Sequence, residues 1–243
     1  MNIDFNPYYD AIHRPYFAFE QTMLEYIPFR VEFPFMVKSI HANSIPFMAP
    51  EVPLVLVSLY LVVCLLGRSR SSRFNHPSFV MLVNLYNAAL VALSIFMSVT
   101  VFVESSRLRY SWFNNHVDES INGLPLAKAL SVFYLSKFPE LFDTVIMAVK
   151  GNTRQISFLH VYHHISIIVI CYCLIYSSPG SDTYWPSFLN SCVHSLMYSY
   201  YLLTSMQIGR FFTLKIKRFM TQLQMVFNIN LASISVDYCA IVI

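Results

Sequence analysis

Apolar residues recur along this chain in six long segments, separated by short stretches where charged and polar residues gather. The segments span 50–66, 78–102, 124–149, 157–176, 184–207 and 217–243. Each reaches, or nearly reaches, the ~20 residues that an α-helix needs to cross the hydrocarbon core of a bilayer. The pattern predicts an all-α, polytopic helical membrane bundle of about six spans over residues 50–243. A proline-punctuated, aromatic region at 1–49 precedes it, which we interpret as a luminal and interfacial region with one amphipathic helix.

Three histidines interrupt the apolar segment 157–176. At about 100° per residue, His163 lies about 60° to one side of His160 and His164 about 40° to the other, so the three imidazoles share one helix face. A single histidine in an apolar helix is more often a packed core residue than a reactive one. Three polar side chains at bilayer depth are costly unless they face a bundle interior or a wet cavity, which favours a functional site.

The segment 124–149 carries charged residues at helical spacing. Lys137, Glu140 and Asp143 follow one another at intervals of three residues. Each ionised group at the bilayer centre costs about 2.5–3.5 kcal/mol, so we expect these side chains to face inward, with Lys137 paired to Glu140. Pro139 removes a backbone hydrogen bond and predicts a bend. Two readings stay open: a set that shapes a site, or a buried ion-pair cluster that fixes the packing of the bundle.

A polar stripe runs along the segment 184–207. Asn190, His194, Tyr198 and Tyr201 recur at i, i+4, i+8 and i+11, on one face of a helix. Such a stripe fits hydrogen bonding between helices as well as it fits catalysis. The same two readings apply to Asn84 and Asn87 in the second segment and to Thr221 and Gln224 in the last.

The composition agrees with a membrane protein. Hydrophobic residues make up 56% of the 243 residues and charged residues 12%, about half the charged fraction of a soluble domain. A net charge of +3 gives no case for a nucleic-acid partner. The five cysteines lie in apolar segments without a zinc-type spacing. The first thirty residues contain no apolar core, so we expect no cleavable signal peptide.

The charges of the loops predict an orientation. Nine lysines and arginines lie in 67–77, 150–156 and 208–218, against two in the alternate loops between spans. By the positive-inside rule the first set is cytosolic and the N-terminus luminal. At about 1.5 Å per residue, His163 and Asp143 lie about 9 Å from the cytosolic end and His194 about 18–20 Å from it. A site there opens to the cytosol, and apolar walls beyond it suit a long acyl chain with a polar head.

The same residues carry a resemblance to a known family. Lys137 to Thr144 is similar to Lys-x-x-Glu-Leu-x-Asp-Thr, His160 to His164 to His-x-x-His-His, and Asn190 to Tyr201 to Asn-x-x-Val-His-x-x-Met-Tyr-x-Tyr-Tyr. These are motifs of the fatty acid elongases, the very-long-chain 3-ketoacyl-CoA synthases of the endoplasmic reticulum. The resemblance covers about residues 45–227 and includes the Tyr-Asn at 86–87. The sequence around Pro139 and the three histidines resembles that of the subgroup that acts on saturated and monounsaturated chains.

The resemblance implies an activity and roles for the candidate residues. Elongases condense an acyl-CoA with malonyl-CoA to a 3-ketoacyl-CoA, CO2 and CoA, without a cofactor or a metal. The resemblance implies that His163 takes the acyl group; we expect Asp143 to hold its other ring nitrogen and His194 to polarise the thioester or enolate. The catalytic candidates are His163, His194, His160, His164 and Asp143, and the substrate-binding candidates are Lys137, Glu140, Asn190, Tyr198, Tyr201, Gln224 and Asn87. Loop charges, Lys150, Arg154, Lys215 and Lys217, are candidates for the CoA phosphates or for setting topology alone.

The family also implies a setting. The expected partners are acyl-CoA, malonyl-CoA, membrane lipid, and the ketoacyl-CoA reductase, dehydratase and enoyl reductase of the elongation cycle; a homo-oligomer stays open. The expected location is the endoplasmic reticulum membrane, as a multi-pass protein. The family has seven spans, the last six of which form a barrel around an acyl tunnel, and we expect six spans here, without the seventh span or the lysine-containing tail. Phe227 stands where the family has a glutamine.

Two other functions compete with elongation. One is an inactive, truncated elongase paralogue, suggested by the expected loss of a span. The other is a membrane di-iron desaturase or hydroxylase, a class that also uses His-x-x-His-His. That class needs about eight histidines, and His13, His41, His76 and His116 lie outside the predicted spans.

Overall fold

Seven α-helices and two short 3-10 helices form the described part of the chain. The structure is a computed structural model that describes residues 18–27, 38–69, 74 and 76–208. No strand occurs among these residues, in agreement with the predicted all-α class. Residues 18–25 form a short α-helix. The other elements are η1 (His41–Ser44), α2 (Glu51–Ser69), α3 (Pro77–Arg107), α4 (Leu124–Glu140), α5 (Phe142–Val149), η2 (Thr153–Gln155), α6 (Phe158–Ser177) and α7 (Tyr184–Ser205).

Three of these helices are long and apolar enough to cross a membrane: α2, α3 and α6. At about 1.5 Å per residue, the 31 residues of α3 reach well beyond the ~30 Å of a hydrocarbon core. The predicted span 184–207 corresponds to α7, which carries the polar stripe. The segment 217–243, with Gln224 and Phe227, lies outside the described residues, so the count of six spans and the division at residue 50 stay predictions.

The predicted span 124–149 is divided into two helices. Pro139 lies inside α4, which ends at Glu140, and α5 begins at Phe142. Because Pro139 has no N–H and its ring crowds the preceding turn, the ladder of backbone hydrogen bonds is interrupted close to it. The helix is thus interrupted at the place where Pro139 predicts a bend, and the polar residues lie on both sides of the interruption.

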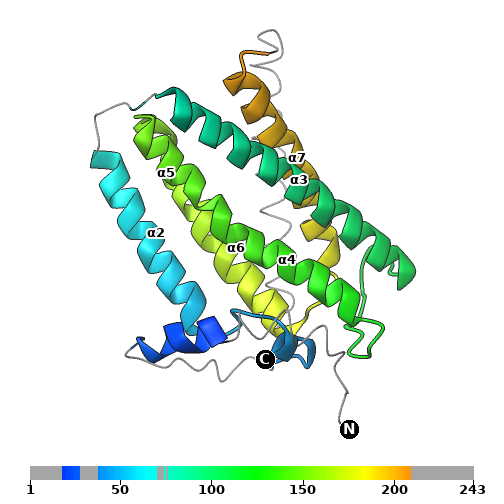
Figure 1. Cartoon of the computed structure of the whole chain (residues 1–243). Coiled ribbons are helices and arrows are strands. Elements are labelled where there is room, and N and C mark those ends of the chain that lie inside the picture. The colour runs from blue at the N-terminus through cyan, green and yellow to red at the C-terminus, as the bar shows by residue number, and fades with distance from the viewer. Residues whose placement is uncertain (1–17, 28–37, 70–73, 75, 209–243) are drawn as a thin grey trace.

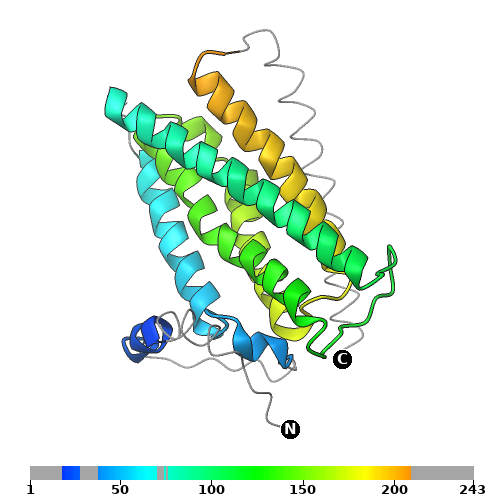
Figure 2. The same ribbon diagram turned by 45° about the vertical axis from the view of Figure 1, so that its right-hand side comes forward.

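The helices pack as a bundle in which α4 is central. α3 lies along α7 and also contacts α4, whereas α2 packs on α5 and α6, and α4 on α6 (Figures 1 and 2). The larger core joins α3, α4, α6 and the start of α7 around buried aromatic residues such as Phe133, Tyr134 and Tyr172. A smaller core joins Tyr60 and Cys64 of α2 to Ala148 and Ile156.

The two ends of the bundle differ in their loops. At the upper end of Figure 1, α2 ends, α3 begins, α5 turns into α6 and α7 ends. These are the connections in which the sequence concentrates lysine and arginine. At the other end, the Asp182 carboxylate accepts hydrogen bonds from the backbone N–H groups of Asn114 and Asn115 at 2.9 and 2.8 Å. The loop 108–123 is thereby held against the α6–α7 connection, at the end for which we predict a luminal location.

Close approach of α2 to α5 depends on Gly67. A Cβ at this position would lie 2.9 Å from Ala148 Cβ, well inside van der Waals contact. We therefore expect Gly67→Ala to destabilise the protein by about 1–3 kcal/mol, although alanine is intrinsically the better helix former by about 1 kcal/mol. Thermal unfolding in detergent measures this change, and the double variant Gly67→Ala/Ala148→Gly should recover most of the loss. A midpoint at or above that of the unsubstituted protein in Gly67→Ala would contradict the packing described.

Candidate active site

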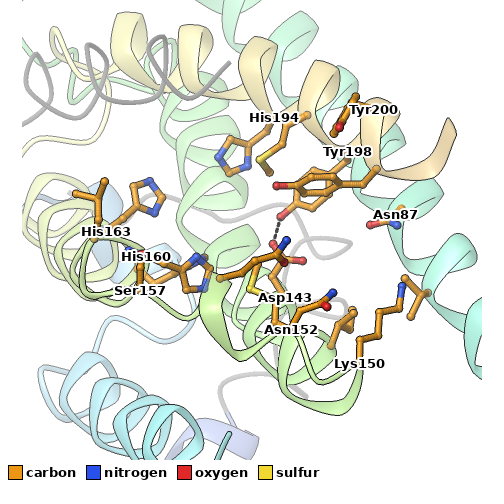
Figure 3. Close-up of a pocket in the computed structure, with 18 of the residues that line it drawn as sticks. Asn87, Asp143, Lys150, Asn152, Ser157, His160, His163, His194, Tyr198 and Tyr200 are labelled. Atoms are coloured by element: carbon orange, nitrogen blue, oxygen red, sulfur yellow. Dashed lines mark hydrogen bonds between the residues drawn. The ribbon is translucent and has the colours of Figure 1, made fainter. Parts of the chain in front are cut away.

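A cavity of about 900 Å³ lies between α3, α5, α6 and α7, at the end of the bundle where the basic loops lie (Figure 3). Eight of the twelve candidate residues line it: His160, His163, His164, His194, Asp143, Asn87, Tyr198 and Tyr201. Lys137, Glu140 and Asn190 do not line it, and Gln224 lies outside the described residues. The fold thus brings most of the predicted set to one place, although four separate sequence segments supply it.

The histidine box occupies the first two turns of α6. Ser157 caps this helix, since its hydroxyl accepts a hydrogen bond from the His160 N–H at 3.2 Å. The ring of His164 contacts those of His160 and His163 edge-on, with centroids 4.5 and 5.2 Å apart. All three rings therefore lie on one helix face, as the spacing predicts.

Two of the three histidines are tied to neighbouring helices. His160 Nε2 lies 2.8 Å from Thr144 Oγ1, which in turn lies 3.1 Å from the hydroxyl of Tyr60 on α2. His164 is buried and its ring packs on that of Tyr60, with centroids 5.6 Å apart. Among the described residues, the ring nitrogens of His163 have no hydrogen-bond partner, and the ring borders the cavity. His163 is therefore the member of the box whose nitrogens are available to a ligand.

Asp143 is held by two tyrosines. Its Oδ2 accepts a hydrogen bond from the Tyr198 hydroxyl at 2.8 Å, drawn in Figure 3. The Tyr86 hydroxyl, which has one proton, lies 2.9 Å from Asp143 Oδ1 and 3.0 Å from the carbonyl oxygen of Pro139. In this structure Asp143 thus bonds tyrosines of α3 and α7, and not the His163 ring as we expected. The break in the helix after Pro139 turns the carboxylate toward that side.

Lys137 and Glu140 form a buried ion pair, and neither residue lines the cavity. Lys137 Nζ donates to Glu140 Oε1 at 2.8 Å and to Asn190 Oδ1 at 3.3 Å, and it lies 4.2 Å from the ring centroid of Phe133. The exposed fractions of Lys137 and Glu140 are 1% and 2%. Neither side chain reaches the space where a ligand would lie. The interpretation of this set as a buried cluster that fixes packing is therefore favoured over direct contact with a substrate.

His194 connects this buried cluster to the cavity. Its Nδ1 lies 3.4 Å from Glu140 Oε1, while its ring borders the cavity and packs on Tyr198, with centroids 5.7 Å apart. Figure 3 shows His194 and His163 on different walls of the same space. The cavity therefore places two imidazoles from separate helices around one volume.

Basic and polar side chains of the loop after α5 line the cavity as well. Lys150, Asn152, Arg154 and Gln155 all belong to the lining. Partial burial of the ammonium group lowers the pKa of Lys150 from its ordinary value. Of the four basic candidates for phosphate groups, Lys150 and Arg154 thus lie where an anionic head would enter, and Lys215 and Lys217 lie outside the described residues.

The sequence pointed only indirectly to three further residues of this region. Tyr86 is the neighbour of the candidate Asn87, and Thr144 is the last residue of the motif that begins at Lys137, so both adjoin residues that the sequence predicts for the site. No sequence pattern predicted a role for Tyr60, because it is a single tyrosine in the apolar helix α2. Its contacts with Thr144 and His164 arise only when α2 packs on α5 and α6. Among the described residues, no group of three His, Cys, Asp or Glu side chains is arranged to hold a metal ion.

A helical membrane bundle with a histidine-lined cavity describes the class of this protein, and comparison with known proteins gives its family. The sequence profile of the ELO (GNS1/SUR4) family matches residues 45–241, and the chain belongs to this family.

Named relatives agree. Fatty acid elongase 6 of Leishmania major is 34% identical over 163 residues, 67% of this chain and 43% of that protein. Very long chain fatty acid elongase 2 of Mus musculus is 34% identical over 175 residues, 71% of this chain and 59% of that protein. The human very long chain fatty acid elongase 4 is 32% identical over 184 residues, 74% of this chain and 59% of that protein. The chain thus spans about half the length of the curated relatives it matches.

Removing one partner of the buried ion pair tests the cluster. In Lys137→Met the Glu140 carboxylate would lose the cation 2.8 Å away, and we expect a loss of about 3–5 kcal/mol in stability. The double variant Lys137→Met/Glu140→Gln removes both charges and should regain most of that loss. Thermal unfolding in detergent compares the two variants with Arg107→Met, which breaks the exposed pair with Glu104 and should change stability by less than about 1 kcal/mol. Equal effects of Lys137→Met and Arg107→Met would contradict the assignment.

Proposed function

We propose that this protein catalyses the first step of fatty acid elongation, the condensation of a long-chain acyl-CoA with malonyl-CoA. Membership of the ELO family and the names of the relatives support elongation in general. The observation that carries the specific reaction is the cavity in which the ring nitrogens of His163 bond none of the described residues and His194 lies on another wall. The relatives are longer than this chain, so the activity is a proposal for this protein.

Substrate enters, in this proposal, from the end of the bundle with the basic loops. Lys150 and Arg154 receive phosphate groups of CoA by charge-assisted contacts, and the thioester reaches the histidines. The saturated or monounsaturated acyl chain lies against apolar side chains of the bundle. Tyr198, Tyr201 and Asn87, which also line the cavity, contact the substrate near its head.

Chemistry begins with nucleophilic attack by the neutral imidazole of His163 on the thioester carbonyl. A nitrogen–carbon bond forms, the carbon–sulfur bond breaks, and CoA leaves as a thiolate. Malonyl-CoA then loses CO2, and the resulting enolate attacks the acyl group, forming the new carbon–carbon bond and freeing His163. The 3-ketoacyl-CoA is passed to a reductase, the enzyme class that acts on a ketone. We place the protein, as a multi-pass protein, in the endoplasmic reticulum membrane.

Substitution of the two histidines separates the acyl acceptor from its helper. We expect His163→Ala to form no acyl-enzyme, because it has lost the nucleophile. We expect His194→Ala to form some acyl-enzyme but to turn over about 10²–10³-fold more slowly, the usual cost of losing one stabilising group. Each variant is incubated with acyl-CoA alone and its intact mass measured, followed by an elongation assay with malonyl-CoA.

His116→Ala is the matched control, since His116 lies exposed in the loop 108–123, away from the cavity, and should behave as the unsubstituted protein. Gain of one acyl group by His163→Ala would assign the nucleophile to another residue. Absence of elongation and of acyl-enzyme in the unsubstituted chain would favour the inactive paralogue instead.

Removal of metal ions tests the proposed absence of a metal. We expect the activity to survive dialysis against a strong chelator, because imidazoles and no metal supply the nucleophile in this mechanism. The assay is run before and after chelation, and the metal content of the purified protein is measured in parallel. Stoichiometric iron, together with activity that disappears on chelation and returns with iron, would instead support a di-iron desaturase or hydroxylase.

A further inference from the structure

Of the two buried carboxylates, Glu140 and not Asp143 lies next to a ring nitrogen of a histidine that lines the cavity. Its Oε1 lies 3.4 Å from Nδ1 of His194. Both side chains are almost fully buried, and only His194 also borders the cavity. A separation of 3.4 Å is slightly longer than a good hydrogen bond, as is common in a site without its substrate. A hydrogen bond between the two atoms therefore needs a rotation of the imidazole.

The protonation of this imidazole follows from what surrounds Glu140. Oε1 accepts hydrogen bonds from Lys137 Nζ at 2.8 Å and from Ser136 Oγ at 3.2 Å. The ammonium group 2.8 Å away favours the ionised carboxylate, and an ionised carboxylate only accepts hydrogen bonds. Nδ1 of His194 is buried and has no hydrogen-bond partner among the described residues, and Glu140 Oε1 is the carboxylate oxygen that lies near it. A neutral imidazole carries one proton on its two ring nitrogens. His194 can donate to Glu140 Oε1 only when this proton is on Nδ1, and Nε2 is then unprotonated.

We propose that Glu140 is a positioning residue that holds His194 with its proton on Nδ1, so that Nε2 faces the acyl cavity as a proton acceptor. This inference rests on the proposed condensation. It also revises the expectation that His194 begins the reaction as a hydrogen-bond donor. Lys137 balances the charge of Glu140, which lets a carboxylate stay ionised at this depth.

The arrangement gives the proton of His163 a place to go. When His163 attacks the thioester, its own N–H proton passes to Nε2 of His194, and the thiolate of CoA leaves. His194 is then an imidazolium beside Glu140, and its Nε2–H can donate to the carbonyl oxygen of malonyl-CoA as the enolate forms. When the new carbon–carbon bond forms and the bond to His163 breaks, the proton returns to His163. Protons and charge balance over the cycle, and no other base is needed.

Nitrogen NMR of the intact chain reads the position of the proton directly. The protein is labelled with 15N-histidine in detergent, and among its eight histidines the His194 signal is identified by its loss in His194→Gln. We expect a protonated Nδ1 and an unprotonated Nε2 in the unsubstituted protein. Glu140→Gln offers an amide that both donates and accepts, so the proton should redistribute toward Nε2. Turnover should fall about 10²-fold or more while KM changes less than about threefold.

Three further variants keep the test decisive. Lys137→Met/Glu140→Gln leaves no buried charge unpaired and should release the His194 proton in the same way, which covers the case in which Glu140→Gln does not fold. Glu140→Asp, which keeps the carboxylate, should restore protonation at Nδ1 and part of the turnover. Glu104→Gln, at the far end of α3, should change neither signal nor turnover.

Two results overturn the proposal: a proton on Nε2 in the unsubstituted protein, or a proton that stays on Nδ1 in the double variant. The NMR result does not depend on elongation. If His194 responds as expected but the chain forms no acyl-enzyme and no product, the proposed function fails and the positioning by Glu140 stands. If the chain elongates acyl-CoA and His194 does not respond, the positioning alone is wrong.

Discussion

The buried pair of Lys137 and Glu140 is the constraint on which the site depends. Two opposite charges, each almost without exposed surface, lie 2.8 Å apart within one turn of α4. Removing either one would leave an uncompensated charge in a low-dielectric interior, which is far more costly than never having buried the pair. The pair therefore fixes how α4 meets α7, because Asn190 and His194 of α7 supply its other polar neighbours. A packing error of one turn would separate all four.

The break between α4 and α5 distributes the polar residues on either side of it. Before the break, Glu140 faces α7 at His194; after it, Asp143 faces Tyr86 of α3 and Tyr198 of α7, and Thr144 faces His160 of α6. In an uninterrupted helix, the directions of these side chains would follow one regular helical spacing. Pro139 makes the interruption local, and the hydroxyl of Tyr86 lies at the carbonyl oxygen of Pro139. The interruption at Pro139 thus lets a short stretch of chain contact three neighbouring helices.

Different histidines consequently serve different purposes. His160 is bonded to Thr144 and His164 is buried against Tyr60, so both hold the start of α6 against α5 and α2. His163 shares their helix face, and its ring nitrogens have no hydrogen-bond partner among the residues that the structure describes. The rigid neighbours keep the available imidazole in a defined place, which a catalytic side chain requires within about 0.5 Å. The tie through Tyr60 also makes α2 part of the support of the site.

The sequence by itself determined the helical class, the approximate bounds of five segments, the interruption at Pro139 and most of the residues that gather at the cavity. These follow from apolar length, helical periodicity and the cost of polar groups in a membrane, all of which are local. Only the tertiary structure decided which partner each polar residue takes. Lys137, Glu140 and Asp143 share one helical spacing, yet two are sealed behind the cavity and the third borders it. Asp143 was expected at His163 and bonds tyrosines, and Tyr60 was not predicted, because partners across helices depend on crossing angles that no local pattern encodes.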